Sequence, residues 1–304
     1  MSSELTRRVA FAVIAVPIGV AIVLYVGAPL SALLAIVSAL AAWELFRLAR
    51  ASGLTPMDDA GIAIAGLIPL LVHARFLRLY DPDSALGALS LGALVLLGIM
   101  GAAIWTRGVN GKPLGAVATT AFGAAYTGGM LSFGYAIRYH DYAFAPANLS
   151  FGGRGVSVPS GGLLLLLPLF ITWASDTGAY AVGRSLGRHK LAAVSPGKTV
   201  EGAIGGLAAS IIVGWAYSHW IMRPAAHLYF RWDPLGAVLF ALIVSISGQI
   251  GDLAKSLFKR EVGVKDSSHI IPGHGGILDR FDSLLFALPI SYVLFTWLLT
   301  WAPA

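Results

Sequence analysis

The residues best suited to chemistry in this chain gather between positions 256 and 282, in surroundings that are otherwise apolar. The cationic side chains of this stretch, which suit phosphate oxygens, are Lys259, Arg260 and Lys265. Its carboxylates, which are hard oxygen ligands of the kind that Mg²⁺ prefers, are Asp266, Asp279 and Asp282. Cations for phosphate and carboxylates for metal in one stretch predict a site for a phosphate ester and a divalent cation.

The same stretch contains a pair of glycines, Gly275 and Gly276, directly after His274. Glycine lets the backbone turn tightly and brings its N–H groups close to a ligand, as in loops that cradle phosphates. His274 could hydrogen-bond a phosphate or polarise a leaving group, and it could equally stabilise the turn. We therefore expect a phosphate-binding loop around the two glycines.

A further carboxylate, Asp252, ends the apolar segment before this stretch, and Asp279 begins the next one. If both segments are helices, the two carboxylates lie at similar depth and can reach one cation. An unpaired aspartate at the centre of a bilayer costs roughly 2.5–3.5 kcal/mol on insertion scales, so each carboxylate needs a partner. The alternative to a metal for Asp252 is an ion pair with Lys255, about one helical turn away.

A second polar cluster follows Asp176 and opens another apolar segment with the sequence SPGKTVEG at residues 195–202. Pro196 suits the first position of a helix, and a Ser or Thr followed by Glu is a capping pattern. The N-terminus of a helix beside Lys198 is also a natural site for an anion. Capping and phosphate binding both remain open for this cluster, which includes Glu201.

The composition is that of a membrane protein. Of the 304 residues, 57% are hydrophobic and 12% are charged, and the mean hydropathy is +0.77. Soluble domains average about 25% charged residues, so we expect a chain that crosses the membrane several times. The absence of cysteine excludes disulfides and thiolate chemistry. The formal charge of +6 reports topology in such a chain, and we expect no nucleic-acid partner.

Apolar runs long enough to cross about 30 Å of hydrocarbon predict an all-α fold with nine transmembrane helices. The expected spans are residues 9–26, 30–48, 60–79, 84–105, 114–137, 161–182, 200–222, 234–254 and 281–301. A cytoplasmic N-terminus places most of the 21 Lys and Arg residues inside, as the positive-inside rule favours. We divide the chain into an N-terminal region for packing and dimerisation, 1–160, and a C-terminal catalytic region, 161–304.

Two features of the N-terminal region have structural interpretations. Glu44 stands three residues before Arg47 near the end of the second expected span, where the two are expected to form an ion pair. The fifth span contains the sequence TTAFGAAYTGGMLSFGYA, residues 119–136, which is rich in small side chains. Small residues let helices approach closely in lipid, so this span is expected to pack closely within the subunit or across a dimer.

Residues 256–282 resemble the signature of the CDP-diacylglycerol synthases, or phosphatidate cytidylyltransferases. That signature specifies Ser, an apolar residue, Lys-Arg, Lys-Asp, a small residue, an apolar residue and Pro, His-Gly-Gly, an apolar residue, Asp-Arg, an apolar residue and Asp. The matching residues are Ser256, Phe258, Lys259, Arg260, Lys265, Asp266, Ser268, Ile271, Pro272, His274, Gly275, Gly276, Ile277, Asp279, Arg280, Phe281 and Asp282. Residues 195–202 resemble the family's second stretch, although Gly197 replaces a lysine and Val200 an aromatic residue.

The resemblance implies the reaction of CTP with phosphatidate to give CDP-diacylglycerol and pyrophosphate, a step in phospholipid biosynthesis. The expected catalytic residues are Asp252, Lys265, Asp266 and Asp279, and the expected metal ligands are Asp252, Asp279 and Asp282. The expected nucleotide-binding residues are Lys198, Glu201, Lys259, Arg260, His274, Gly275, Gly276 and Arg280. Mg²⁺ is the expected cofactor, with a second cation such as K⁺. The expected partners are CTP, phosphatidate, membrane lipids and a second copy of the chain, in a bacterial cytoplasmic (inner) membrane with the site facing the cytoplasm.

Two alternatives remain open on the sequence. One is a CTP-dependent transferase or kinase that acts on another lipid phosphate or lipid alcohol, such as an isoprenoid lipid, and its products would differ. The other is a non-catalytic transporter or scaffold. A transporter would place its polar residues near the middle of the membrane, whereas here they collect at one interface.

Overall fold

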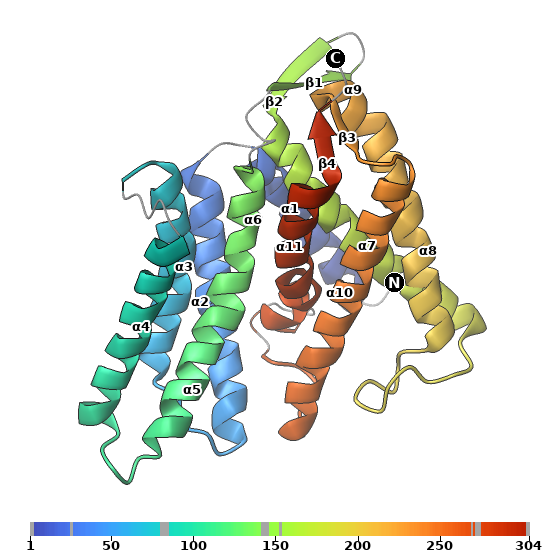
Figure 1. Cartoon of the computed structure of the whole chain (residues 1–304). Coiled ribbons are helices and arrows are strands. Elements are labelled where there is room, and N and C mark those ends of the chain that lie inside the picture. The colour runs from blue at the N-terminus through green and yellow to red at the C-terminus, as the bar shows by residue number, and fades with distance from the viewer. Residues whose placement is uncertain are drawn as a thin grey trace. The chain divides into compact units, whose positions relative to one another are not determined.

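Figure 1 shows the computed structural model of the chain, which describes residues 3–24, 27–79, 85–140, 146–151, 154–268, 270 and 275–301. Within these ranges the chain is mostly helical. The α-helices are α1 (Ser3–Leu24), α2 (Ala28–Ala51), α3 (Asp58–Phe76), α4 (Ala85–Thr106), α5 (Pro113–Ala124), α6 (Met130–Arg138), α7 (Ser160–Leu186), α8 (Val200–Tyr217), α9 (Arg223–Ala226), α10 (Leu235–Glu261) and α11 (Leu278–Leu298). Two π-helical turns, η1 (Ala125–Gly129) and η3 (Ser218–Met222), join α5 to α6 and α8 to α9.

Helices occupy the apolar ranges that the sequence predicts to be spans. Among the described residues, 6 helices are long and apolar enough to cross a membrane. They are Ala28–Ala51, Asp58–Phe76, Ser160–Leu186, Val200–Ala226, Leu235–Glu261 and Leu278–Leu298. The expectation of a helical integral membrane protein is confirmed, and the count of nine spans stays a prediction.

The chain forms two compact units, and each combines distant parts of the sequence. Unit 1 consists of Met1–Val26, Ala136–Leu257 and Phe281–Ala304, and unit 2 consists of Gly27–Tyr135 and Phe258–Arg280. Helices α10 and α11 therefore contribute residues to both units. The functional regions expected from the sequence, 1–160 and 161–304, do not coincide with these two units, and that division stays a prediction.

In unit 1, helices α7 and α8 pack closely because small residues face each other along them. A Cβ atom on Gly178 would lie 2.7 Å from the carbonyl oxygen of Gly205, and one on Gly202 would lie 3.1 Å from the Cα atom of Gly183. Such close backbone approach is how helices associate in lipid, where apolar area gives no driving force. The packing brings the first turn of α8 against the last turns of α7.

Unit 2 contains a tight core of small residues around Phe46 of α2. The ring of Phe46 is fully buried with Ala42, Ala65 and Ala124. A Cβ atom on Gly123 would collide with this ring, so the glycine is required for the approach of α5 to α2. The close helix packing expected of the glycine-rich span is confirmed here, and packing across a dimer stays a prediction.

Four short strands in unit 1 form two antiparallel pairs beside the helices. Strand β1 (Pro146–Phe151) pairs with β2 (Arg154–Pro159) in the register Pro146↔Pro159. Strand β3 (Leu228–Phe230) pairs with β4 (Leu299–Trp301), in the register Leu228↔Trp301. Pairing with β3 satisfies the backbone of β4, so the last helix ends at Leu298. This helix, Leu278–Leu298, begins and ends earlier than the expected ninth span, 281–301.

Candidate active site

Four charged side chains of unit 1 form a chain of alternating charge, which we call the unit 1 cluster. Asp252 of α10 forms ion pairs with Lys198, from the loop before α8, and with Lys255, whose Nζ lies 3.3 Å from Asp252 Oδ1. The Nζ atom of Lys255 also donates a hydrogen bond to Oδ2 of Asp282, in α11. Both polar regions that the sequence singled out therefore contribute to one cluster.

Burial makes the pairing in the unit 1 cluster obligatory. The side chains of Lys255 and Asp282 are only 5% and 9% exposed. A buried charge that loses its partner is strongly destabilising, and here one ammonium group serves two carboxylates. The second oxygen of Asp282, Oδ1, accepts a hydrogen bond of 2.6 Å from the backbone N–H of Ser283. The alternative considered for Asp252, an ion pair with Lys255, is thus present in the structure, and the expected role of Asp252 as a metal ligand stays a prediction.

A cavity of about 340 Å³ in unit 1 is lined by part of this cluster. Its lining includes Lys198 and Asp252, together with Asp176, Tyr180 and Arg184 from α7. Arg184 donates a hydrogen bond of 2.7 Å to the hydroxyl oxygen of Tyr180. Small-molecule sites usually measure about 300–1,000 Å³, and this cavity lies at the lower end of that range.

The loop before α8 is held by the first residues of that helix. Thr199 has an extended backbone, and its Oγ1 accepts a hydrogen bond of 3.1 Å from the N–H of Gly202, so it is the N-cap. The carboxylate of Glu201 accepts hydrogen bonds from the N–H of Arg188, at 3.0 Å, and from Nδ1 of His189, at 2.5 Å. Capping is therefore confirmed, and Glu201 orders the loop. Its expected contact with a nucleotide stays a prediction.

In unit 2 a second group of residues, the unit 2 cluster, surrounds the carboxylate of Asp279 in the first turn of α11. Lys259 Nζ donates to Asp279 Oδ1 at 2.8 Å. Asp279 Oδ2 accepts from the N–H of Ser267 at 2.9 Å, from Ser267 Oγ at 2.9 Å and from the N–H of Gly276 at 3.2 Å. Lys259, Asp279 and Gly276 are brought together as the sequence predicts, in a loop folded around one carboxylate.

The unit 2 cluster includes a residue that the sequence analysis assigned elsewhere. Glu44 of α2 is fully buried, and its carboxylate accepts hydrogen bonds from the hydroxyls of Ser267 and Ser268 and from the N–H groups of Ile277 and Leu278. These four donors come from residues more than 200 positions away in the sequence. No local pattern could have paired them. The one signal available was an acidic side chain inside an apolar span, which is itself a pointer to function.

The expected ion pair between Glu44 and Arg47 is wrong. The guanidinium group of Arg47 lies over the ring of Trp43, with its Cζ atom 4.8 Å from the ring centroid. The physical reason is that four loop donors already satisfy the carboxylate of Glu44, while Arg47 gains a cation–π contact.

Comparison with known proteins identifies the family. A family model described as "Cytidylyltransferase family" matches residues 6–298. The chain belongs to the cytidylyltransferase family. It is 33% identical over 297 residues to a phosphatidate cytidylyltransferase of Synechocystis sp. (strain ATCC 27184 / PCC 6803 / Kazusa), a match that covers 94% of this chain and 95% of the relative. It is 46% identical over 168 residues to the phosphatidate cytidylyltransferase of Staphylococcus aureus (strain COL), covering 51% of this chain and 60% of the relative.

The other residues expected in the site of this family member lie around the same loop. Lys265 and Asp266 are exposed. A Cβ atom on Gly275 would lie 3.3 Å from Asp279 Oδ2 and 3.7 Å from Asp266 Oδ1, so the two carboxylates flank the glycine. Gly275 has a φ of +78°, which L residues rarely adopt. Two more expected residues, Arg260 and Arg280, are exposed on α10 and α11, and His274 lies outside the described residues.

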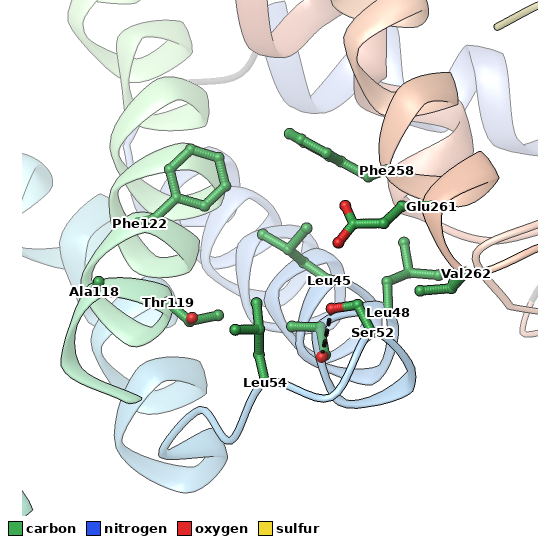
Figure 2. Close-up of a pocket in the computed structure, with 11 residues that line it drawn as sticks. Leu45, Leu48, Ser52, Leu54, Ala118, Thr119, Phe122, Phe258, Glu261 and Val262 are labelled. Carbon is green, nitrogen blue, oxygen red and sulfur yellow. Dashed lines mark hydrogen bonds between the residues drawn. The ribbon is translucent and has the colours of Figure 1, made fainter. Parts of the chain in front are cut away.

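Figure 2 shows a different cavity in unit 2, of about 300 Å³. Its walls are mainly apolar side chains of α2, α5 and the end of α10, such as Leu45, Phe122 and Phe258, and Glu261 brings a carboxylate to it. The residues expected in the site do not line it. An apolar wall does not suit a phosphate, so this cavity does not fit the phosphate site that the sequence predicts.

A substitution at Gly276 tests how closely the unit 2 cluster is packed. A Cβ atom at this position would collide with Ser267 Oγ and with the carboxylate of Glu44. The change Gly276→Ala is therefore expected to lower the stability of the chain by about 1–3 kcal/mol, as overpacking does, and to reduce turnover because the loop must move. Thermal unfolding and initial rates measure the two effects.

The matched control for this prediction is Gly115→Ala, in α5 of the same unit. A Cβ atom there would meet nothing within 4 Å, so the change should leave stability equal or raise it by up to about 1 kcal/mol. Equal stability for both variants would contradict the close packing at Gly276.

Proposed function

We propose that this chain transfers the cytidylyl group of CTP to phosphatidate, giving CDP-diacylglycerol and pyrophosphate. The observation that carries the proposal is the unit 1 cluster, in which Lys198 from one polar stretch and Asp282 from the other join through Asp252 and Lys255 beside a cavity of about 340 Å³. Family membership supports the use of CTP. The names of the relatives, phosphatidate cytidylyltransferases, support phosphatidate as the acceptor.

The reaction needs positioning and charge stabilisation more than a strong base. A phosphate oxygen of phosphatidate attacks the α-phosphorus of CTP, and the bond from that phosphorus to the bridging oxygen of the pyrophosphate breaks. Both reactants are anionic, so the site must offset their repulsion and hold them in line. Lys198, in the loop before α8, suits phosphate oxygens. So do Lys259, Arg260, Lys265 and Arg280, which lie on or near the loop between α10 and α11. The diacyl tails can remain in the bilayer while the headgroup reaches the interface.

The donor set fits Mg²⁺ that arrives with the nucleotide. Mg²⁺ is usually held by one or two carboxylates, water and substrate phosphates, not by a cage made of protein alone. Among the described residues there is no group of three or more His, Asp or Glu that could hold a metal. In unit 1, Asp252 and Asp282 present hard oxygens to one cationic group, the ammonium of Lys255.

We therefore assign Asp252, Asp279 and Asp282 as the residues that would hold Mg²⁺, which would neutralise the triphosphate when bound. Asp252 and Asp282 belong to unit 1, and Asp279 belongs to unit 2. Asp266 and Asp282 are the candidates for a second cation such as K⁺. His274, Gly275, Gly276 and Glu201 complete the proposed nucleotide site.

The proposed setting is a bacterial cytoplasmic membrane, with nine spans, a cytoplasmic N-terminus and the loop between α10 and α11 facing the cytoplasm. The distribution of Lys and Arg supports this orientation through the positive-inside rule. It would place the site where nucleoside triphosphates are available. A homodimer formed through the N-terminal region, 1–160, is part of the same proposal.

Isotope transfer tests the reaction. Purified protein in detergent is given phosphatidate, Mg²⁺ and CTP that carries phosphorus-32 at either the α or the γ position. The lipid is expected to gain label from α-labelled CTP and none from γ-labelled CTP, because cytidylyl transfer keeps the α-phosphorus and releases the other two. A CTP-dependent lipid kinase would give the opposite pattern and release CDP.

The acceptor is tested by replacing phosphatidate with an isoprenoid phosphate in the same assay. Label in the isoprenoid lipid alone would assign the chain to the alternative transferase. Failure of folded protein to label any lipid phosphate, across several divalent metals, would overturn the proposed reaction.

A further inference from the structure

Glu44 lies outside both stretches that carry the family resemblance. All four hydrogen-bond donors to its carboxylate nevertheless come from one of them, residues 256–282. Each of its oxygens accepts from one serine hydroxyl and one backbone N–H. Oε1 receives Ser268 Oγ and the N–H of Ile277, the latter at 2.9 Å. Oε2 receives Ser267 Oγ at 2.7 Å and the N–H of Leu278 at 2.8 Å. The carboxylate thus joins the arm of the loop before the glycine pair to the arm after it.

This set of donors requires a carboxylate. An ionised Glu is an acceptor at both oxygens, whereas the amide of Gln has one acceptor oxygen and an NH₂ group that only donates. Whichever way a glutamine at position 44 turned, its NH₂ would face a backbone N–H of either Ile277 or Leu278. Two donors would then oppose each other at a site that is 0% exposed to solvent, where a lost hydrogen bond is costly.

The residues that Glu44 holds are also the residues that orient Asp279. Ser267 Oγ lies 2.7 Å from Glu44 Oε2 and 2.9 Å from Asp279 Oδ2. A hydroxyl has one proton, so Ser267 donates to one carboxylate at a time and links the two. The backbone N–H of Ser267 donates to Asp279 as well, and Gly276, whose N–H does the same, packs against Glu44.

We propose that Glu44 is a positioning residue for the reaction: it clamps the two arms of the loop and thereby holds Asp279 against Lys259. The expected effect of Glu44 on turnover rests on the proposed function. Its expected effect on the loop rests only on the contacts in unit 2. Loss of a residue that orients a metal ligand or catalytic group typically lowers affinity or activity about 10- to 100-fold.

The test compares Glu44→Gln with Glu261→Gln, which makes the same change at an exposed carboxylate of the same unit. Hydrogen–deuterium exchange is measured on purified protein without nucleotide or metal, followed on peptides that cover residues 275–280. The amides of Ile277 and Leu278 are expected to exchange faster in Glu44→Gln and at the wild-type rate in Glu261→Gln. The value of kcat is expected to fall about 10- to 100-fold in Glu44→Gln alone, with a higher Mg²⁺ concentration at half-maximal activity.

Three results would overturn the proposal. One is wild-type exchange at these amides together with reduced kcat. Another is faster exchange throughout unit 2, which would indicate general structural support. The third is a Glu44→Gln variant that needs the same Mg²⁺ concentration as the wild type and whose kcat falls only as much as its folded fraction falls. If wild-type protein has no cytidylyltransferase activity, the proposed function fails, while local exchange at these amides still decides whether Glu44 clamps the loop.

Ser268→Ala keeps the test decisive if Glu44→Gln does not fold. This change removes one hydroxyl donor and leaves the carboxylate with the other three. It is expected to speed exchange at the same amides by less than Glu44→Gln would. Wild-type exchange and wild-type kcat in Ser268→Ala would contradict the proposal.

Discussion

Replacing Asp279 by asparagine is expected to lower turnover by about 10²- to 10³-fold or more while the protein stays folded. The structure explains why the effect should be specific to charge. Three loop donors share Asp279 Oδ2, which an amide oxygen can replace, so the loop can keep its hydrogen bonds. The other oxygen, Oδ1, accepts from Lys259, and an NH₂ group in its place would face an ammonium group. The variant therefore loses the negative charge proposed to bind metal and keeps the acceptor for the three loop donors. It also removes the carboxylate partner of Lys259, whose side chain is 11% exposed, so some loss of stability is expected beside the loss of turnover.

Initial rates with phosphatidate and CTP measure this effect, and thermal unfolding checks that the variant is folded. Asp59→Asn is the matched control, because Asp59 is an exposed carboxylate on α3 of the same unit. Turnover near the wild-type level in Asp279→Asn would remove Asp279 from the catalytic machinery.

Replacing Lys255 by methionine is expected to cost about 3–5 kcal/mol of stability when no divalent cation is present. Methionine keeps most of the length of the side chain but removes the ammonium group that lies against Asp252 and Asp282. Both carboxylates would then lose a cationic partner, and Asp282 is only 9% exposed. Chemical or thermal unfolding in detergent measures the loss.

The proposed metal site also predicts how the stability of the Lys255→Met variant responds to Mg²⁺. If Asp252 and Asp282 hold Mg²⁺, the ion should stabilise this variant more than the wild type, because it replaces the missing positive charge. Lys190→Met, at an exposed lysine of the same unit, should change stability by less than about 0.5 kcal/mol and should respond to Mg²⁺ as the wild type does. An equal response to Mg²⁺ in Lys255→Met and wild type would argue against a metal at these carboxylates.

The helical membrane fold could be predicted from the sequence because its physical cause is local. A backbone in lipid must satisfy its own hydrogen bonds, so long apolar runs become helices wherever they lie in the chain. The ion pair of Asp252 with Lys255 could be predicted for the same reason, since residues three or four apart on a helix are neighbours. The cap at Thr199 is local as well.

By itself, then, the sequence determined the class of fold, the family and the short segments in which the charged residues lie. Only the tertiary structure decided which distant charges meet, because pairing between helices depends on how their small residues pack. It joined Lys198 to Asp252 across the packed helices of unit 1, turned Glu201 toward its own loop, and gave Glu44 four partners in place of Arg47. A buried carboxylate takes the donors that surround it, and those donors are fixed by the packing of helices far apart in the chain.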